Sequence, residues 1–285
     1  MIWKLIRLEY ELRSPLHVGY HKIGNVQRTR YYIPARNLWA SMTERLTQAG
    51  FQTSNAANGN YQATGEWLRM HCAFTYFFLS SETRFLRPEY TEKGLCYGDL
   101  PEARFERQFL AAHVTTAIQS ASRSAKVEGL HEVEYIRPCD DEGRHRRVAG
   151  WIFLDEIAVA DLGAGLDLWL KELQVGGERR YGFGRLSLVS LEKITTAAID
   201  GYGIRTDVAD RPQIQVRASP LLAHTVVNSV QVKGMIEPLV GRETTSDSAK
   251  FGRKLMPAKL CWVPGSVVQD ALWFSISFSG VWEPA

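Results

Sequence analysis

The chain has 285 residues, of which 45% are hydrophobic and 11% aromatic, so a substantial core can form and global disorder is excluded. The formal net charge is only +3, so binding to nucleic acid would depend on local basic clusters rather than on a strong global field. Because the sequence has no run of about 18 apolar residues and its N-terminus lacks a signal-peptide core, we expect no membrane helix and a cytoplasmic location.

The N-terminal segment predicts a strand, a basic loop and a helix. Charged and apolar residues alternate over residues 2–13, which is typical of a half-buried strand. A turn over 14–19 and a basic segment over 21–30 follow it. Pro34 then stands where the first residue of a helix is favoured, and apolar residues recur behind it at helical spacing.

The middle of the chain mixes loops and strands. Residues 52–65 are polar and contain glycine, which indicates a loop, and the apolar run over 73–79 indicates a central strand. Residues 84–107 have no clear period, so we interpret them as a surface insertion. Two strand patterns, over 129–136 and 151–154, are separated by a charged tip and predict a β-hairpin.

A helix, a glycine-rich loop and a strand complete the first part of the chain. Apolar residues recur at helical spacing over 162–173, and residues 183–191 have a strand pattern. The resulting element order over residues 1–195 is that of an α+β, ferredoxin-like (RRM-related) domain with insertions. Residues 196–285 are rich in strand patterns and form either a second, degenerate ferredoxin-like half or a β extension.

The loop over residues 175–185 carries the strongest functional signal, with four glycines, three arginines and two aromatic residues. Glycine lets a backbone approach a ligand closely, arginine offers a planar fork of donors for phosphate, and an aromatic ring can stack on a base. The loop is not a G-x-G-x-x-G fingerprint, because Ser187 stands where the third glycine belongs, and it is not a P-loop. We therefore predict nucleic-acid binding, with a flexible basic surface turn as the alternative.

Metal and disulfide chemistry are not expected. The cysteines lie far apart and form no C-x-x-C pair, which is the usual sign of a zinc site. Disulfides are disfavoured in a cytosolic chain, so we predict free or buried thiols and no metal or other cofactor. The cysteines are Cys72, Cys96, Cys139 and Cys261.

Three motifs, taken in order, resemble the RAMP superfamily of CRISPR-associated proteins. They are the strand end over 14–19 with the helix start over 32–38, the segment over 116–135, and the glycine-rich loop. Residues 232–242 are in addition similar to the type III-D member of the group. The resemblance implies a ferredoxin-like, RRM-related RAMP fold that binds CRISPR RNA within a type III effector complex.

The resemblance also implies a particular place in that complex. Repeating backbone subunits commonly carry an Ile-Asp-Arg sequence whose aspartate cleaves target RNA, whereas this chain has Ile118, Gln119 and Ser120 there. The better match is the single-copy, non-catalytic capping subunit, which binds the 5′ handle of the CRISPR RNA and contacts the large polymerase-like subunit. The implied partners are CRISPR RNA, target RNA in the assembled complex and the other effector subunits.

Two regions supply the predicted RNA contacts. The glycines of the loop would let the backbone approach the RNA, and the neighbouring arginines and tyrosine would cradle the handle. The basic segment before the first helix, and the start of that helix, would extend the surface. The predicted RNA-binding residues are Gly176, Gly177, Arg179, Arg180, Tyr181, Gly182, Gly184, His17, Lys22, Arg28, Arg30 and Arg36.

The charged tip over 140–147 has two interpretations. It acts as a thumb that separates guide bases from target bases, or it is a solvated hairpin end. The thumb interpretation depends on Arg144, Arg146 and Arg147.

Three other functions remain open at this point. The chain is a repeating backbone subunit, a precursor CRISPR RNA endoribonuclease that uses His17, His21 or His113 as general acid or base, or a protein–protein scaffold. Interfaces favour tryptophan, although most of these side chains should lie in the core. The tryptophans in question are Trp151, Trp169, Trp262, Trp273 and Trp282.

Overall fold

A sheet of seven strands lies at the centre of the N-terminal part of the chain, with strand order β13, β14, β1, β12, β6, β4 and with β5 beside β12. In this computed structural model the described residues are 2–52, 60–80, 84–196, 198–208, 210–227, 231–243, 254–255 and 257–285. The strands of the central sheet are β1 (Lys4–Leu12), β4 (Tyr32–Ile33), β5 (Cys72–Phe74), β6 (Phe77–Ser80), β12 (Arg147–Leu154), β13 (Glu172–Gln174) and β14 (Arg185–Ile194). The predicted N-terminal strand is confirmed as β1, which pairs antiparallel with both β12 and β14.

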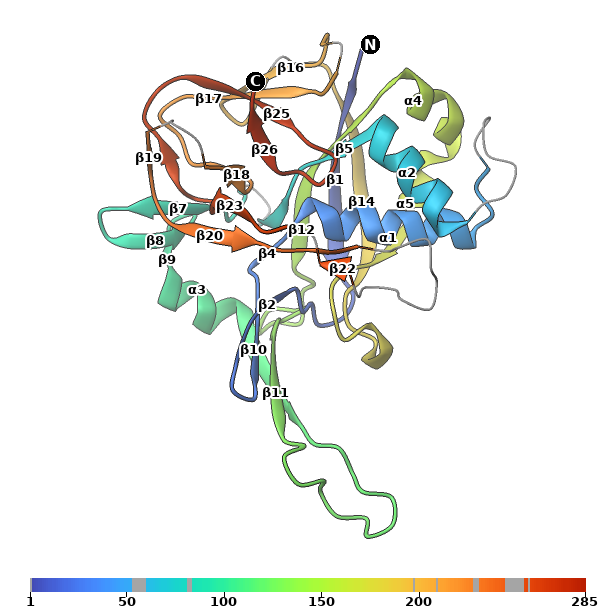
Figure 1. The fold of residues 1–285 in the computed structure, drawn as a ribbon, viewed down its shortest axis with the longest axis vertical. Helices are drawn as coiled ribbons and strands as arrows, with labels where there is room; N and C mark the ends of the chain where they lie inside the picture. The colour runs from blue at the N-terminus through green and yellow to red at the C-terminus, as the bar shows by residue number, and fades with distance from the viewer. Residues whose placement is uncertain are drawn as a thin grey trace.

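Four helices cover one face of this sheet (Figure 1). They are α1 (Ala35–Gln48), α2 (Tyr61–His71), α4 (Glu156–Leu162) and α5 (Leu166–Leu170), with a 3₁₀ turn η1 (Gly163–Gly165) between the last two. Leu38 and Met42 of α1 lie against Leu8 and Tyr10 of β1, so the helical spacing of apolar residues becomes the packing face. No helix in the described part of the chain is long and apolar enough to cross a membrane.

Two helices differ from the sequence prediction. The predicted loop over 52–65 ends earlier, because Asn60 caps α2 by accepting a hydrogen bond from the backbone amide of Ala63 at 2.7 Å. The predicted helix over 162–173 is broken at Gly163, which has a positive φ of +55°, and its last turns give way to β13.

The predicted central strand over 73–79 is two short strands, β5 and β6. The chain bends between them at Thr75, whose hydroxyl accepts a hydrogen bond from the Trp151 amide at 2.8 Å. Both strands still pair with β12, so the prediction of a central position is confirmed.

The predicted hairpin between residues 129–136 and 151–154 is wrong. The strand β11 (His131–Ile136) pairs with β10 (Leu110–Thr115) and with β3 (Val26–Thr29), in a separate sheet that β2 (Gly19–Ile23) completes. In contrast, β12 lies between β1 and β6. The reason is burial: β12 is buried along nearly its whole length, which only a strand covered on both faces achieves, whereas β11 is half-exposed.

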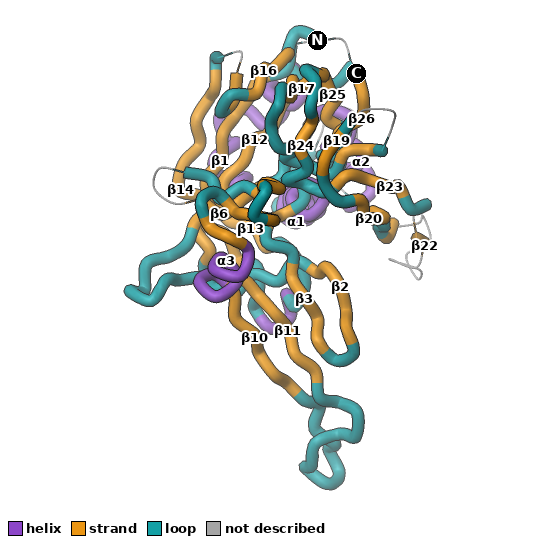
Figure 2. Tube along the Cα trace, turned by 90° about the vertical axis from the view of Figure 1, so that its left-hand side faces the viewer, coloured by secondary structure: helices purple, strands orange, loops and turns teal. Residues whose placement is uncertain are grey.

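The sheet of β10, β11, β3 and β2 projects from the body of the molecule, and the connection over 116–130 forms its far end (Figures 1 and 2). We call β10, this connection and β11 the long hairpin (residues 110–136).

The predicted surface insertion over 84–107 has its own small core. It contains β7 (Pro88–Thr91), β8 (Gly94–Tyr97) and β9 (Leu100–Pro101), followed by α3 (Glu102–Phe109). Tyr97 stacks on Phe105 with ring centroids 4.3 Å apart, and Phe105 stacks on Phe109 at 4.7 Å. Charged side chains conceal this aromatic core in the sequence, because they occupy the exposed positions between the buried rings.

The part of the chain after β14 is built of strands, and its described residues contain no helix. The main sheet has eight strands: β15 (Ala198–Ile199), β16 (Tyr202–Arg205), β17 (Gln213–Val216), β25 (Leu272–Ile276), β26 (Trp282–Pro284), β18 (Thr225–Val226), β23 (Lys259–Trp262) and β20 (Ile236–Leu239). Two further pairs are β19 (Val232–Lys233) with β24 (Val267–Val268), and β21 (Arg242–Glu243) with β22 (Lys254–Leu255).

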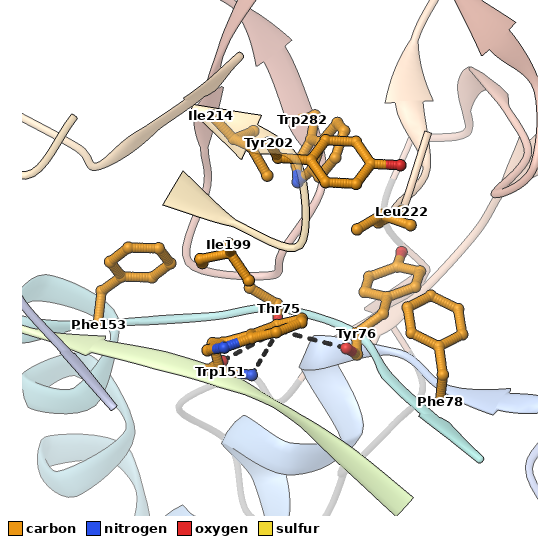
Figure 3. Close-up of a pocket in the computed structure, with 10 residues that line it drawn as sticks. All are labelled: Thr75, Tyr76, Phe78, Trp151, Phe153, Ile199, Tyr202, Ile214, Leu222 and Trp282. Carbon is orange, nitrogen blue, oxygen red and sulfur yellow. Dashed lines mark hydrogen bonds between the residues drawn. The ribbon is translucent and has the colours of Figure 1, made fainter. Parts of the chain in front are cut away.

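The two large sheets pack against each other through apolar side chains (Figure 3). Because successive residues of a strand face opposite sides, Ile152 of β12 points toward the helices while Trp151 and Phe153 point toward the C-terminal strands. Ile199 and Ile214 approach them from the C-terminal side. The remaining cavity is about 10 Å³, room for one water at most, so this contact is core and not a ligand site.

Candidate nucleic-acid interface

The glycine-rich loop joins β13 to β14 and contains a 3₁₀ turn, η2 (Arg179–Tyr181). Its two ends are tied together, since the Val175 amide donates to the Gly184 carbonyl at 2.9 Å. The Gly184 amide in turn donates to the Pro15 carbonyl at 2.7 Å, which fixes the loop to the segment after β1. The loop is therefore held at its base, as a binding loop on a rigid scaffold must be.

His17 connects the glycine-rich loop to the long hairpin. It is buried, with 4% of its surface exposed, and its carbonyl accepts a hydrogen bond from the Gly177 amide at 2.8 Å. Its Nδ1 lies 2.7 Å from the Glu134 carbonyl, to which it donates. Gly176 has a φ of +84°, and a Cβ there would lie 2.2 Å from the His17 carbonyl oxygen. His17 thus positions the loop from beneath instead of facing solvent.

The outer side of the loop presents Arg180 and Tyr181 to solvent. Tyr181 is 80% exposed, and Arg180 is also exposed. Gly182 ends the turn with a φ of +87°, and no atom lies within 4 Å of where its Cβ would be. The tyrosine before it therefore projects into solvent. An exposed aromatic ring beside a guanidinium group is suited to stacking on a base while contacting a phosphate.

Arg179 points the other way, toward α1. Its guanidinium group forms an ion pair with Glu44, and its carbonyl accepts a hydrogen bond from the Gln174 side-chain amide at 3.1 Å. The pair anchors the loop to α1, and 37% of the Arg179 side chain remains exposed.

The basic segment before α1 is largely engaged within the protein. Arg28 contacts Glu106 at 2.9 Å and Glu134 at 3.4 Å. Arg30 contacts Glu237 at 2.8 Å and has a side-chain exposure of only 14%. These carboxylates neutralise both arginines locally, whereas Lys22 is exposed on β2.

Arg36, at the start of α1, faces the C-terminal part of the chain. A Cβ on Gly241 would lie 2.7 Å from its Nη1. The twelve predicted residues therefore separate into three groups. They are the loop with His17, the β2–β3 ribbon with Lys22 and Arg28 and with Arg30 directly after it, and Arg36 on α1.

The long hairpin begins beside the loop and ends far from it. Tyr135 contacts Phe183 edge-on, with ring centroids 5.6 Å apart, at the base. Toward the far end the side chains of Ile118, Val127 and Leu130 are 69%, 85% and 56% exposed. Sequence reasoning missed this projection, although the small and hydroxyl-bearing residues over 115–124 are a signal for an exposed connection.

Two of the three arginines of the predicted thumb over 140–147 contact the body of the protein, and the third pairs within the turn itself. Arg144 pairs with Asp140 at 2.8 Å, Arg146 lies over the Phe109 ring at 4.2 Å, and Arg147 pairs with carboxylates of β1. The segment is a short turn whose ends are joined by an isolated antiparallel β-bridge between the backbones of Cys139 and His145.

The other candidate groups are mostly structural. Trp151 and Trp282 are 4% and 1% exposed and belong to the core. The cysteines are free, and Cys72 and Cys261 are buried. No group of three or more histidine, cysteine, aspartate or glutamate side chains within the described residues is placed to hold a metal ion.

Comparisons with known proteins indicate a shared architecture. No protein-family model matches the chain, and no curated protein matches it. A chain of the type III-B Cmr-beta complex bound to cognate target RNA and AMPPnP is similar in structure, with a TM-score of 0.55 and 15% identity over 92% of this chain and 85% of that chain. A chain of the same complex bound to cognate target RNA gives a TM-score of 0.53 and 13% identity over 92% and 86% of the two chains. At this identity the likeness establishes a common mixed α/β fold.

Proposed function

We propose that this protein is a RAMP-type, RNA-binding subunit of a type III CRISPR effector complex, with a ferredoxin-like core around β1. The observation that carries the proposal is the glycine-rich loop, which is fixed at its base and presents Arg180 and Tyr181 outward. The fold shared with chains of a type III-B complex bound to target RNA supports it.

Within this proposal the loop binds the 5′ handle of the CRISPR RNA. Tyr181 stacks on an unpaired base, Arg180 contacts a phosphate, and the backbone around Gly182 approaches the RNA because no side chain stands in the way. The protein contributes no catalytic group. Its neighbours would be the polymerase-like large subunit and the other effector subunits.

The long hairpin is the better candidate for the thumb role, which was one of the two interpretations of residues 140–147. It is the projection with exposed apolar side chains, and such side chains can act as wedges between base steps. We infer that the hairpin reaches along the RNA and separates guide bases from target bases.

The handle-binding role is tested by exchanging both outward side chains, Arg180→Ala with Tyr181→Ala, in the complex purified from its host. Both side chains are exposed, so the fold should be unaffected while the amount of CRISPR RNA per complex falls. Arg104→Ala, on the exposed side of α3, is the matched control and should retain RNA as the parent does. Parental RNA content in the double variant would refute handle binding by this loop.

A further inference from the structure

A groove of about 530 Å³ opens beside the glycine-rich loop, on the side of α1. This volume is within the range of sites that hold small ligands or single nucleotides. Ser41 and Arg45 of α1 form one wall, and Gln174 and Arg185 of the central sheet form the other. The Gln174 amide donates to the Ser41 hydroxyl at 3.1 Å and joins the two walls, while Arg179 of the loop also lines the groove.

The groove is electropositive. Four arginines and two glutamates line it. Arg13 lies 3.4 Å from a glutamate of β1, and Arg179 is paired with a glutamate of α1. Arg45 and Arg185 have no side-chain partner among the residues that the structure describes, so their charges are available to a ligand.

Two donors in this lining lack acceptors. The Nε atoms of Arg45 and Arg179 are buried and have no hydrogen-bond partner within the described part of the chain. Buried unpaired donors are uncommon in native proteins, and a polar ligand or an ordered water is one way to satisfy them. The two that line this groove both belong to guanidinium groups, for which the oxygens of an anion would serve as acceptors.

We propose that this groove binds a phosphate group of single-stranded RNA, with Arg45 and Arg185 as its principal ligands. Planar guanidinium forks match the paired oxygens of a phosphate. The groove shares Arg179 with the loop that exposes Tyr181, so the groove and the tyrosine belong to neighbouring parts of one loop. This inference rests on the proposed RNA-binding function and extends the site to α1.

The phosphate is either internal to the strand or at its 5′ end, and one experiment separates these sources. The probe is a 3′-labelled single-stranded RNA of about 12 nucleotides, made with a 5′-hydroxyl and with a 5′-phosphate. Its affinity for the full chain is measured by fluorescence anisotropy between about 50 and 200 mM salt. The variants are Arg45→Ala with Arg185→Ala, Arg180→Ala with Tyr181→Ala, and the control Arg104→Ala.

The groove variant should bind about tenfold more weakly and have a smaller slope of affinity against salt, by about one for each lost phosphate contact. An equal loss for both RNAs identifies an internal phosphate, and a loss confined to the 5′-phosphorylated RNA identifies a terminal one. Parental affinity and slope in the groove variant, together with weakened binding in the loop variant, would refute phosphate binding in the groove. The proposed function would then remain intact. No RNA binding by the parent chain would contradict both.

Discussion

Gly184 has a φ of +79°, and a Cβ at this position would lie 1.8 Å from the Val175 carbonyl oxygen. Gly176 likewise approaches the His17 carbonyl. From the sequence we expected the backbone at these glycines to lie close to a bound RNA. The structure shows that at Gly176 and Gly184 the closest neighbour is the protein's own backbone, a contact between residues that no local pattern reveals.

Replacing Gly184 with alanine should therefore destabilise the fold. The clash with Val175 adds to the cost of the left-handed backbone, and we expect the free energy of unfolding to fall by about 3 kcal/mol or more. Gly182→Ala is the control, because its φ of +87° is similar but no atom lies within 4 Å of the added Cβ. It should cost only about 1–2 kcal/mol. Urea unfolding measures both variants, and equal losses would show that the clash is relieved by movement of the loop.

At the scale of elements, local periodicity predicted the elements whose own residue spacing defines a buried face. The alternation in β1 and the helical spacing in α1 each specify a buried face, and both elements form as expected. The hairpin prediction was wrong because β11 and β12 both have strand patterns across a polar turn, yet each pairs elsewhere. Which strands pair depends on which of them is buried on both faces. That is decided when the sheets assemble and is not visible in a single strand pattern.

The long hairpin provides a prediction at this scale. Replacing residues 117–129 with a short Asn-Gly turn should leave the thermal unfolding midpoint unchanged, because Ile118 and Val127 are 69% and 85% exposed. The complex should keep its CRISPR RNA but bind target RNA more weakly. A matched trimming of the turn over 140–143 should change neither RNA. If only the second change weakened target binding, the thumb would be the short turn after all.

At the scale of the whole molecule, a buried polar chain joins the N-terminal sheets to the C-terminal strands. The Tyr76 hydroxyl lies 2.7 Å from Nδ1 of His224, whose Nε2 lies 2.5 Å from Glu237. Arg30, directly after β3, contacts Glu237 at 2.8 Å. These residues are spread over the sequence, so their association follows only from the packing of the two large sheets.

This buried network of polar side chains makes the stability of the fold depend on pH. Burial alone would raise the pKa of Glu237, but the hydrogen bond with His224 and the charge of Arg30 lower it to about 2. Burial also lowers the pKa of His224. Because both pKa values are lower in the folded state, their stabilisation is complete above about pH 6.5 and is lost as the pH falls, for Glu237 between about 4.5 and 2.

We expect Glu237→Gln to lower the free energy of unfolding by about 3 kcal/mol at pH 7 and to flatten its dependence on pH below about 5. Glu92→Gln, at an exposed turn, is the control and should leave the curve unchanged. Urea unfolding across the pH range measures both variants. Parental stability and pH dependence in Glu237→Gln would show that the buried polar network contributes nothing to stability.

The central claim is that this protein holds a guide RNA, and it is tested most directly by sequencing the RNA that co-purifies with the tagged chain from its native host. The account predicts short RNAs that share one 5′ end and differ in the sequence that follows. A folded preparation with no such RNA would contradict the account and favour a protein scaffold.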